Sequence, residues 1–264
     1  MPFHVRLGPF AISPVELFAV AGIVLAGVLA RRRMSPPPSW GALVDLMLAA
    51  IVGGAVGARL YYFVPRWLRG LEEGAKLFTE WSQGSGYVGG LVGGTLAVAA
   101  VARMKGLAPL HVVDAVGLHI PLGFAVGKVG CFLAGCCFGP RCEGFPGVAF
   151  GPRSLAYEAH RAAVRVHPTQ LYELVLGVLL YLGLAALHRR SKRPGETYVA
   201  YVAGYSAWRF VIEFFRADPG RHEFGASALS DSQISSIVLG LAAGAAWAWL
   251  RTRKVEGEAR PAPK

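Results

Sequence analysis

The stretch 110-LHVVDAVGLHIPLGFAV-126, continued by 127-GKVGCFLAGCCFG-139, decides how this chain folds and where its chemistry lies. The first part is an apolar run of nearly the length that a membrane-crossing helix needs. The second part contains four glycines, one lysine and three of the four cysteines of the chain. Glycines at this density allow the backbone to turn sharply and to approach a ligand closely. Because thiols beside a cation provide chemistry that a simple turn does not need, we interpret residues 127–139 as a candidate site.

The composition of the chain is that of a membrane protein. Of its 264 residues, 54% are hydrophobic and only 16% are charged, whereas a soluble domain carries about a quarter charged residues. The apolar residues fall in runs of about twenty, separated by short basic clusters. We therefore predict an all-α, polytopic integral membrane protein, with one membrane domain over residues 1–250 and a polar cytoplasmic tail over residues 251–264. The net charge of +11 lies mainly between the spans and indicates topology signals and contacts to the lipid bilayer, not nucleic acid.

The hydrophobic runs predict about seven transmembrane helices. Positive charges follow the first run instead of preceding it, which favours a retained helix over a cleaved signal peptide. The three loops expected inside, residues 31–39, 103–109 and 188–195, contain basic residues but no Asp or Glu. This asymmetry predicts an N-terminus outside and a C-terminus in the cytoplasm. The expected spans are Pro14–Ala30, Trp40–Val64, Tyr87–Ala102, Leu110–Val126, Pro168–Leu187, Thr197–Phe215 and Leu229–Leu250.

A long outer segment, Pro140–Val166, connects the fourth and fifth predicted spans. Within it, the pattern of Arg153–Arg165 is compatible with an amphipathic helix lying on the membrane surface.

Five charged residues from four predicted spans share one depth near the outer face: Arg59, Lys128, Glu173, Arg209 and Glu213. Charges inside a bilayer are costly and normally face a partner or a water-filled cavity. The last two are four residues apart, and so lie on one face of a helix. We interpret the set as a polar chamber that opens outward, whose cations hold an anionic group such as a lipid phosphate. The alternative is a set of snorkelling charges at helix ends together with a structural Glu–Arg pair.

The cysteines follow the spacing C-x4-C-C-x4-C, at positions 131, 136, 137 and 142. This spacing differs from the usual zinc patterns, and we assign no metal ligands and no cofactor from it. Disulfides on an oxidising outer face, a low-pKa thiol beside Lys128 and simple small-residue packing all remain open. Three polar residues deeper in the fourth span, His111, Asp114 and His119, are expected to find partners on neighbouring helices.

The sequence His167-Pro168-Thr169-Gln170-Leu171-Tyr172-Glu173 resembles a motif of the prolipoprotein diacylglyceryl transferase family. Further matching pieces follow in the same order from the second span to the last: 57-GARL-60, 89-GGL-91, 121-PLG-123, 127–139, 209-RFVIEFFR-216 and 233-QISS-236. The resemblance implies seven transmembrane helices in the bacterial inner membrane. It also implies transfer of diacylglycerol from phosphatidylglycerol to the thiol of the lipobox cysteine of a prolipoprotein.

Carried over residue by residue, the resemblance implies that Arg209 binds or polarises the lipid phosphate, and that Glu173 and Glu213 hold the arginines in place. Lys128 and His167 complete the expected catalytic set. The expected lipid- and phosphate-binding residues are Arg59, Lys128, Arg209, Gly89, Gly90 and Gly139.

The chain also departs from the family pattern. Lys128 stands where the pattern has arginine, Cys131 and Ala134 replace asparagines, Cys136 replaces a glutamate and Val88 replaces a histidine. We therefore interpret the chain as a divergent, cysteine-rich branch, with Cys131, Cys136, Cys137 and Cys142 as a possible thiol site. Two other functions are kept as alternatives: a non-catalytic lipid- or metal-binding membrane protein, and a thiol–disulfide membrane redox protein.

Overall fold

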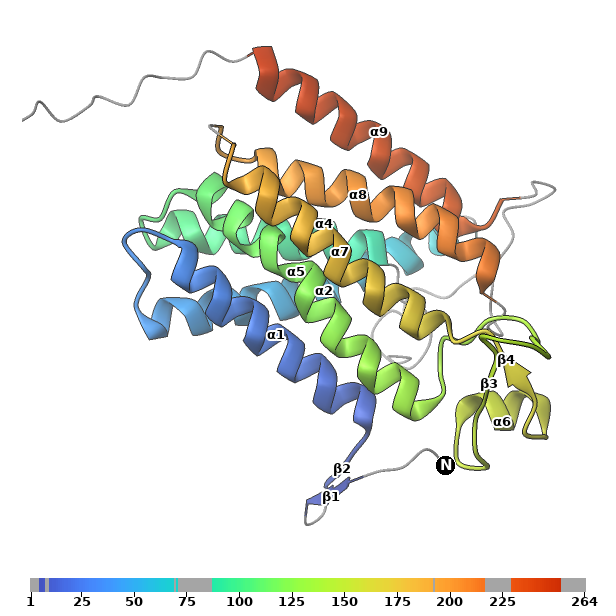
Figure 1. Ribbon diagram of the computed structural model, residues 1–264. Helices are drawn as coiled ribbons and strands as arrows, with labels where there is room; N and C mark the ends of the chain where they lie inside the picture. The colour runs from blue at the N-terminus through green and yellow to red at the C-terminus, as the bar shows by residue number, and fades with distance from the viewer. Residues whose placement is uncertain are drawn as a thin grey trace, which may run out of the picture.

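The structure is a computed structural model that describes residues 5–7, 10–68, 70, 87–191, 193–216 and 229–252. Long helices dominate these ranges and run roughly alongside one another, which confirms the predicted all-α membrane fold (Figure 1). They are α1 (Pro14–Arg33), α2 (Trp40–Leu68), α4 (Tyr87–Met104), α5 (Pro109–Ala134), α7 (Thr169–His188), α8 (Glu196–Ile212) and α9 (Asp231–Thr252).

Six of these helices are long and apolar enough to cross a membrane within the described ranges: α1, α2, α4, α5, α7 and α9. Helix α8 has 17 residues and continues into a short 3-10 helix, η1 (Glu213–Phe215). The predicted sixth span, Thr197–Phe215, therefore corresponds to α8 and η1 together, and the count of seven spans stays a prediction. Helix α9 includes Arg251 and Thr252, the first two residues of the predicted tail; residues 253–264 lie outside the described ranges.

Helix α5 is the centre of the bundle. It contacts α1, α4, α7 and α8, and 39% of its apolar window is buried, the largest share among the six candidate spans. Glycine makes the closest of these contacts possible: a Cβ at Gly22 of α1 would lie 2.2 Å from the carbonyl oxygen of Gly123 of α5. Helices without side chains at their crossing can bring their backbones together, which is the usual way that packing stabilises helices in a membrane.

A second glycine seam joins α2 to α4. A Cβ at Gly57 would lie 2.2 Å from the carbonyl oxygen of Gly89, and a Cβ at Gly53 would lie 2.7 Å from that of Gly93. Gly89, predicted to bind lipid, instead packs against Gly57 and Tyr61 of α2 in the structure.

Asp114 finds the partner on a neighbouring helix that was expected, whereas the described hydrogen bond of His119 is with its own helix. The buried Asp114 carboxylate accepts hydrogen bonds from the backbone N–H groups of Gly195, at 2.6 Å, and Tyr198, at 2.8 Å. It therefore caps the N-terminus of α8 from another helix, and so satisfies donors that a helix start leaves unpaired. The Nδ1 atom of His119 lies 2.8 Å from the carbonyl oxygen of Ala115. His111 is exposed.

The predicted C-terminal boundary of the fourth span, Val126, was wrong. Helix α5 continues through Lys128 and Cys131 to Ala134. Gly130 permits this extension, because its missing side chain leaves room for the carbonyl oxygen of Pro14 at the start of α1. The helix ends where Gly135 takes a left-handed conformation with φ of 64°, as glycine commonly does at helix C-termini.

The predicted amphipathic helix over Arg153–Arg165 was also wrong in length. The structure has a short helix, α6 (Leu155–His160), and a two-stranded antiparallel pairing of β3 (Val148–Ala149) with β4 (Arg165–Val166). Ser154 caps the start of α6, and Arg161, at φ of 52°, ends it. The segment folds on its own small core of Phe138, Phe150, Ala156 and Val166, beside the end of α5 and the start of α7 (Figure 1). A second small hairpin pairs β1 (Val5–Leu7) with β2 (Phe10–Ile12).

Candidate functional site

A buried ion pair joins the two helices that carry the strongest sequence motifs. The Lys128 ammonium on α5 donates a hydrogen bond to the Glu173 carboxylate on α7. Their side chains are only 9% and 2% exposed. The Lys128 Nζ atom also lies 4.9 Å from the centre of the Phe124 ring. Buried charges of this kind are tolerated only when each has a partner.

A second ion pair lies at the C-terminal end of α8. Arg209 Nη1 is 2.6 Å from Glu213 Oε2, in the i,i+4 relation that the sequence predicted. The other terminal nitrogen of Arg209 donates a hydrogen bond of 3.0 Å to the Ser232 hydroxyl on α9. A guanidinium held from two sides presents its remaining N–H groups in a fixed direction.

The start of α9 is built to hold Ser232 in this place. The backbone N–H of Ser230 donates to Gln233 Oε1 at 2.9 Å, and the backbone N–H of Gln233 donates to the Ser230 hydroxyl at 3.3 Å. This reciprocal arrangement is a capping box. Ser232 was not predicted as a site residue from the sequence. The pattern Ser230-x-x-Gln233 indicates a helix start and would have placed Ser232 in the first turn of that helix.

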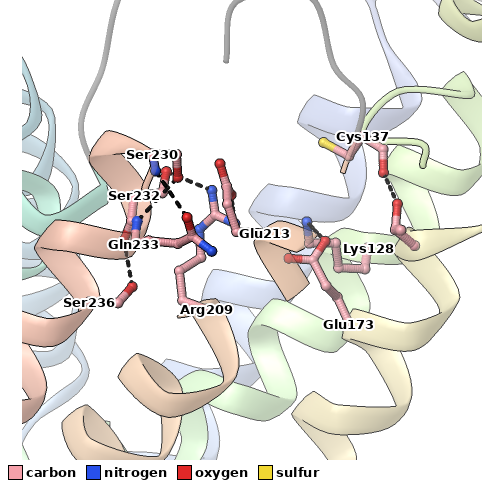
Figure 2. A network of polar contacts seen from close by, with 10 residues as sticks. Lys128, Cys137, Glu173, Arg209, Glu213, Ser230, Ser232, Gln233 and Ser236 are labelled. Carbon is pink, nitrogen blue, oxygen red and sulfur yellow. Dashed lines mark hydrogen bonds and ion pairs between the residues drawn. The ribbon is translucent and has the colours of Figure 1, made fainter. Parts of the chain in front are cut away.

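The two ion pairs lie at the same end of the bundle and appear together in Figure 2. The charges of Glu173 and Arg209 both act on the Tyr205 hydroxyl, which lies on α8 one turn before Arg209. Two buried side-chain atoms around them have no hydrogen-bond partner within the described structure: Gln170 Oε1 and Gln233 Nε2. Buried polar atoms are normally hydrogen-bonded, so this cluster has unused capacity for a polar ligand.

Arg59 and Gly90 lie on the neighbouring helices α2 and α4. Arg59 is 5% exposed, and its guanidinium carbon lies 4.2 Å from the centre of the Phe63 ring. Gly90 lines a cavity of about 590 Å³ among α1, α2, α4, α5 and α8. Val88, at the position of the family histidine, lies beside it in the first turn of α4 and is half-buried.

Gly139 and His167 connect the cysteine stretch to the start of α7. The backbone N–H of Gly139 donates to the His167 carbonyl oxygen at 2.9 Å, and a Cβ at Gly139 would lie 2.5 Å from the carbonyl oxygen of Phe215. Gly139 thus allows close packing of three segments. The His167 ring nitrogen Nδ1 lies 3.0 Å from the Tyr172 hydroxyl, so the described contacts place this side chain against Tyr172 and not against either ion pair.

Three of the four cysteines come together. The Sγ atoms of Cys131, Cys136 and Cys137 all lie within 4.8 Å of one another. Hydrogen bonds from the Cys131 and Cys136 thiols, together with the Lys128 charge, lower the pKa of the Cys137 thiol. Cys142 is separate from this cluster, and its Sγ donates to the Gly144 carbonyl oxygen at 3.6 Å.

An apolar cavity of about 480 Å³ reaches this end of the bundle. It is lined by residues of α1, α2 and α5, from Met34 and Leu43 at one end to Lys128 and Cys131 at the other. The cavity is large enough for part of a lipid chain, and its polar end lies at the Lys128–Glu173 ion pair.

These features define a polytopic helical membrane protein with a buried, charged site beside an apolar cavity. The sequence profile of the prolipoprotein diacylglyceryl transferase family matches residues 2–249. The chain therefore belongs to this family of membrane transferases.

Individual relatives agree with the profile. A phosphatidylglycerol–prolipoprotein diacylglyceryl transferase of Gloeobacter violaceus is 32% identical over 265 residues, covering 98% of this chain and 96% of its own length. One from Citrobacter koseri is 31% identical over 279 residues, covering 95% and 94%. The phosphatidylglycerol–prolipoprotein diacylglyceryl transferase 2 of Clostridium perfringens is 31% identical over 199 residues, covering 75% of this chain and 74% of its own length.

Proposed function

We propose that this chain transfers diacylglycerol from phosphatidylglycerol to the lipobox cysteine thiol of a prolipoprotein. The observation that carries the proposal is the pairing of a buried lysine and a half-buried arginine with two buried carboxylates, at the end of the bundle reached by an apolar cavity of about 480 Å³. Family membership over nearly the whole chain supports the same activity. We place the protein in the bacterial cytoplasmic membrane, with the site near the outer face, where exported precursors present their lipobox.

Arg209 is the residue best placed to hold the lipid phosphate. Its Nη1 atom is ion-paired with Glu213 at 2.6 Å, and each terminal guanidinium nitrogen carries two N–H groups. A phosphate oxygen accepts a remaining N–H of Arg209, and charge-assisted hydrogen bonds of this kind are among the strongest in proteins. Glu213 and Ser232 fix the direction of the guanidinium, so the donors are in place before the lipid arrives.

Lys128 supplies the second positive charge. It sits where the apolar cavity meets the polar end of the bundle, so part of an acyl chain occupies the cavity while the headgroup faces the two cations. The reaction then joins the acceptor sulfur to the glyceryl carbon and breaks the bond from that carbon to the phosphate oxygen. The leaving glycerol phosphate carries the electron pair and gains negative charge, which Arg209 and Lys128 stabilise.

The proposal is tested by supplying this chain to a strain depleted of its own diacylglyceryl transferase and by measuring transfer to a lipobox peptide with purified protein. The Arg209→Ala variant is expected to lose about 100-fold or more in turnover, as expected when a preorganised donor to developing charge is removed, while accumulating normally in the membrane. Arg153→Ala is the matched control, because Arg153 is exposed in the loop before α6. Wild-type turnover in Arg209→Ala, or no transfer by the wild type, would contradict the proposal.

The same experiment separates the two alternatives. A lipid- or metal-binding protein without catalysis binds phosphatidylglycerol but produces no lipidated peptide. A thiol–disulfide redox protein exchanges thiols with a test substrate and needs no phospholipid.

A further inference from the structure

The three clustered thiols are brought together by the way α5 ends. Cys131 lies in the last turn of the helix, and the left-handed Gly135 reverses the chain directly after it. The backbone N–H of Cys136 then donates to the Cys131 carbonyl oxygen at 3.1 Å. Cys137 follows with φ of 58°, a conformation that side chains other than glycine adopt rarely and that often marks functional sites.

Two buried side chains at the start of α7 hold this reversal in place. The Gln170 amide donates to the Cys136 carbonyl oxygen at 2.5 Å, and the Thr169 hydroxyl donates to the Cys137 carbonyl oxygen. Both side chains are fully buried. Thr169 and Gln170 therefore position the two cysteines through their backbone carbonyl groups and leave the sulfur atoms unused. Metal ligands in proteins are likewise oriented by hydrogen bonds from surrounding residues.

The spacing of the sulfur atoms suits a small tetrahedral metal ion. An ion about 2.3 Å from three sulfurs in tetrahedral geometry separates them by about 3.8 Å. The three Sγ atoms already lie within 4.8 Å of one another, so side-chain movements of about 1 Å bring them onto one ion. A donor set of three sulfurs selects soft or borderline ions such as Zn²⁺ and excludes Mg²⁺ and Ca²⁺, which prefer oxygen.

The charge balance is also favourable. Three thiolates and one Zn²⁺ ion carry a net charge of −1, and the cation Lys128 lies three residues before Cys131 on α5. Within the described ranges, no fourth Cys, His, Asp or Glu joins the cluster. Cys142 is held elsewhere by its backbone hydrogen bond of 2.9 Å to Arg165. Zinc sites that keep an open position are the catalytic ones, whereas structural sites use four protein ligands.

We propose that Cys131, Cys136 and Cys137 bind one Zn²⁺ ion as thiolates, and that the fourth position of the ion takes the thiol of the acceptor cysteine. The second half of this proposal rests on the proposed diacylglyceryl transfer. It replaces the expectation, drawn from cysteine spacing alone, that the chain has no metal ligands. Cys131 also lines the apolar cavity together with Lys128, so an ion held here lies beside the place proposed for the lipid.

The chemistry follows from the ion's effect on its fourth ligand. A thiol bound to zinc loses its proton to water and stays a thiolate at neutral pH. Its sulfur forms the bond to the glyceryl carbon while the bond from that carbon to the phosphate oxygen breaks. The electron pair leaves with glycerol phosphate, and the thioether product releases the ion because it carries no negative charge. No oxidant or reductant takes part.

Metal binding is tested on the full chain in detergent, reduced and freed of metal, by titration with Zn²⁺ and by elemental analysis. One Zn²⁺ per chain is expected in the wild type and in Cys142→Ser, the matched control from the same segment. Cys131→Ser, Cys136→Ser and Cys137→Ser are each expected to bind about 100-fold or more weakly, since losing a ligand costs at least as much as losing a residue that supports one. Because a variant can misfold, Zn²⁺ is also expected to protect three of the four wild-type cysteines from alkylation.

Acceptor binding is tested with Co²⁺ in place of Zn²⁺, whose visible absorption reports on the ligand set. A lipobox peptide with cysteine is expected to change the spectrum, and the same peptide with serine is expected to leave it unchanged. The metal site would be overturned if the reduced wild type bound no Zn²⁺, with or without a disulfide within the cluster before reduction. It would also be overturned if Cys142→Ser lost as much Zn²⁺ affinity as the three cluster variants. An identical response to both peptides would overturn the acceptor position. Neither readout depends on turnover, so failure of the transferase proposal gives a different pattern.

Discussion

The Lys128 ammonium and the Glu173 carboxylate pair with each other across the contact between α5 and α7, with side chains 9% and 2% exposed. At this burial neither charge is fully solvated, so each depends on the other. The pair therefore does two things in the proposed reaction: it keeps a cation at the mouth of the apolar cavity, and it ties together the two helices that position the cysteine cluster.

Replacing Lys128 separates these roles. Lys128→Ala leaves Glu173 buried without a partner, which costs about 3–5 kcal/mol, and it removes a phosphate contact. Lys128→Arg keeps the charge and adds a planar fork of donors, so transfer is expected to be retained or improved. Thermal unfolding in detergent and the lipobox-peptide assay measure the two effects.

The double variant Lys128→Met/Glu173→Gln provides the control. It removes both charges, so it is expected to recover stability relative to Lys128→Ala without recovering transfer. Full activity in Lys128→Ala would rule out a role for this cation in the reaction.

Asp114 is expected to matter for stability alone. Its carboxylate accepts from the backbone N–H groups of Gly195 and Tyr198, and loss of a helix cap costs about 0.5–2 kcal/mol. Asp114→Ala should lower the unfolding temperature, while Asp114→Asn should lower it less, since the amide keeps one acceptor oxygen. The activity per folded molecule should stay near that of the wild type; a selective loss of turnover would instead give Asp114 a part in the chemistry.

The charged residues of both ion pairs could be predicted from sequence because their signals are local or compositional. Arg209 and Glu213 lie four residues apart on one helix, so their contact follows from helix geometry. Lys128 and Glu173 lie near the ends of two apolar runs, where hydropathy and loop charge indicate the same depth. The pairing itself needed the structure, since depth does not say which helices are neighbours.

The cysteine cluster and the role of Ser232 could not be predicted from sequence, for a different reason. The spacing C-x4-C-C differs from the usual zinc patterns and left disulfides, a low-pKa thiol and packing open, because the convergence of the sulfurs depends on a left-handed Gly135 and a positive φ at Cys137. The contact of Ser232 with Arg209 depends on how α9 lies against α8. Local sequence patterns do not encode such tertiary relations.

The glycine seam between α2 and α4 gives a prediction about packing. A Cβ at Gly57 would lie 2.2 Å from the Gly89 carbonyl oxygen and 2.9 Å from the Gly93 Cα atom. Both contacts are with backbone, which cannot rotate away, so Gly57→Ala must push the two helices apart and lower the unfolding temperature. Gly183→Ala on α7 is the matched control, since nothing lies within 4 Å of the added Cβ. There alanine should be neutral or stabilising by about 1 kcal/mol, through its higher helix propensity; equal effects of the two changes would show that the seam does not set the helix spacing.

The orientation of the bundle can be tested with reporter fusions at three points. Residues 31–39, 103–109 and 188–195 are basic and free of Asp and Glu, and positive loops are retained in the cytoplasm. Gly106 follows the end of α4 and Ser191 follows the end of α7, whereas Gly151 lies in the segment that follows α5, at the end that carries the cysteine cluster. Fusions ending at Gly106 and Ser191 are therefore expected to report the cytoplasm, and a fusion ending at Gly151 is expected to report the outside. Precursors are exported before they are modified in the proposed reaction, so the site must face outward for the two ion pairs to act on them. A cytoplasmic signal at Gly151 would place the cysteine cluster and both ion pairs on the wrong side for that substrate.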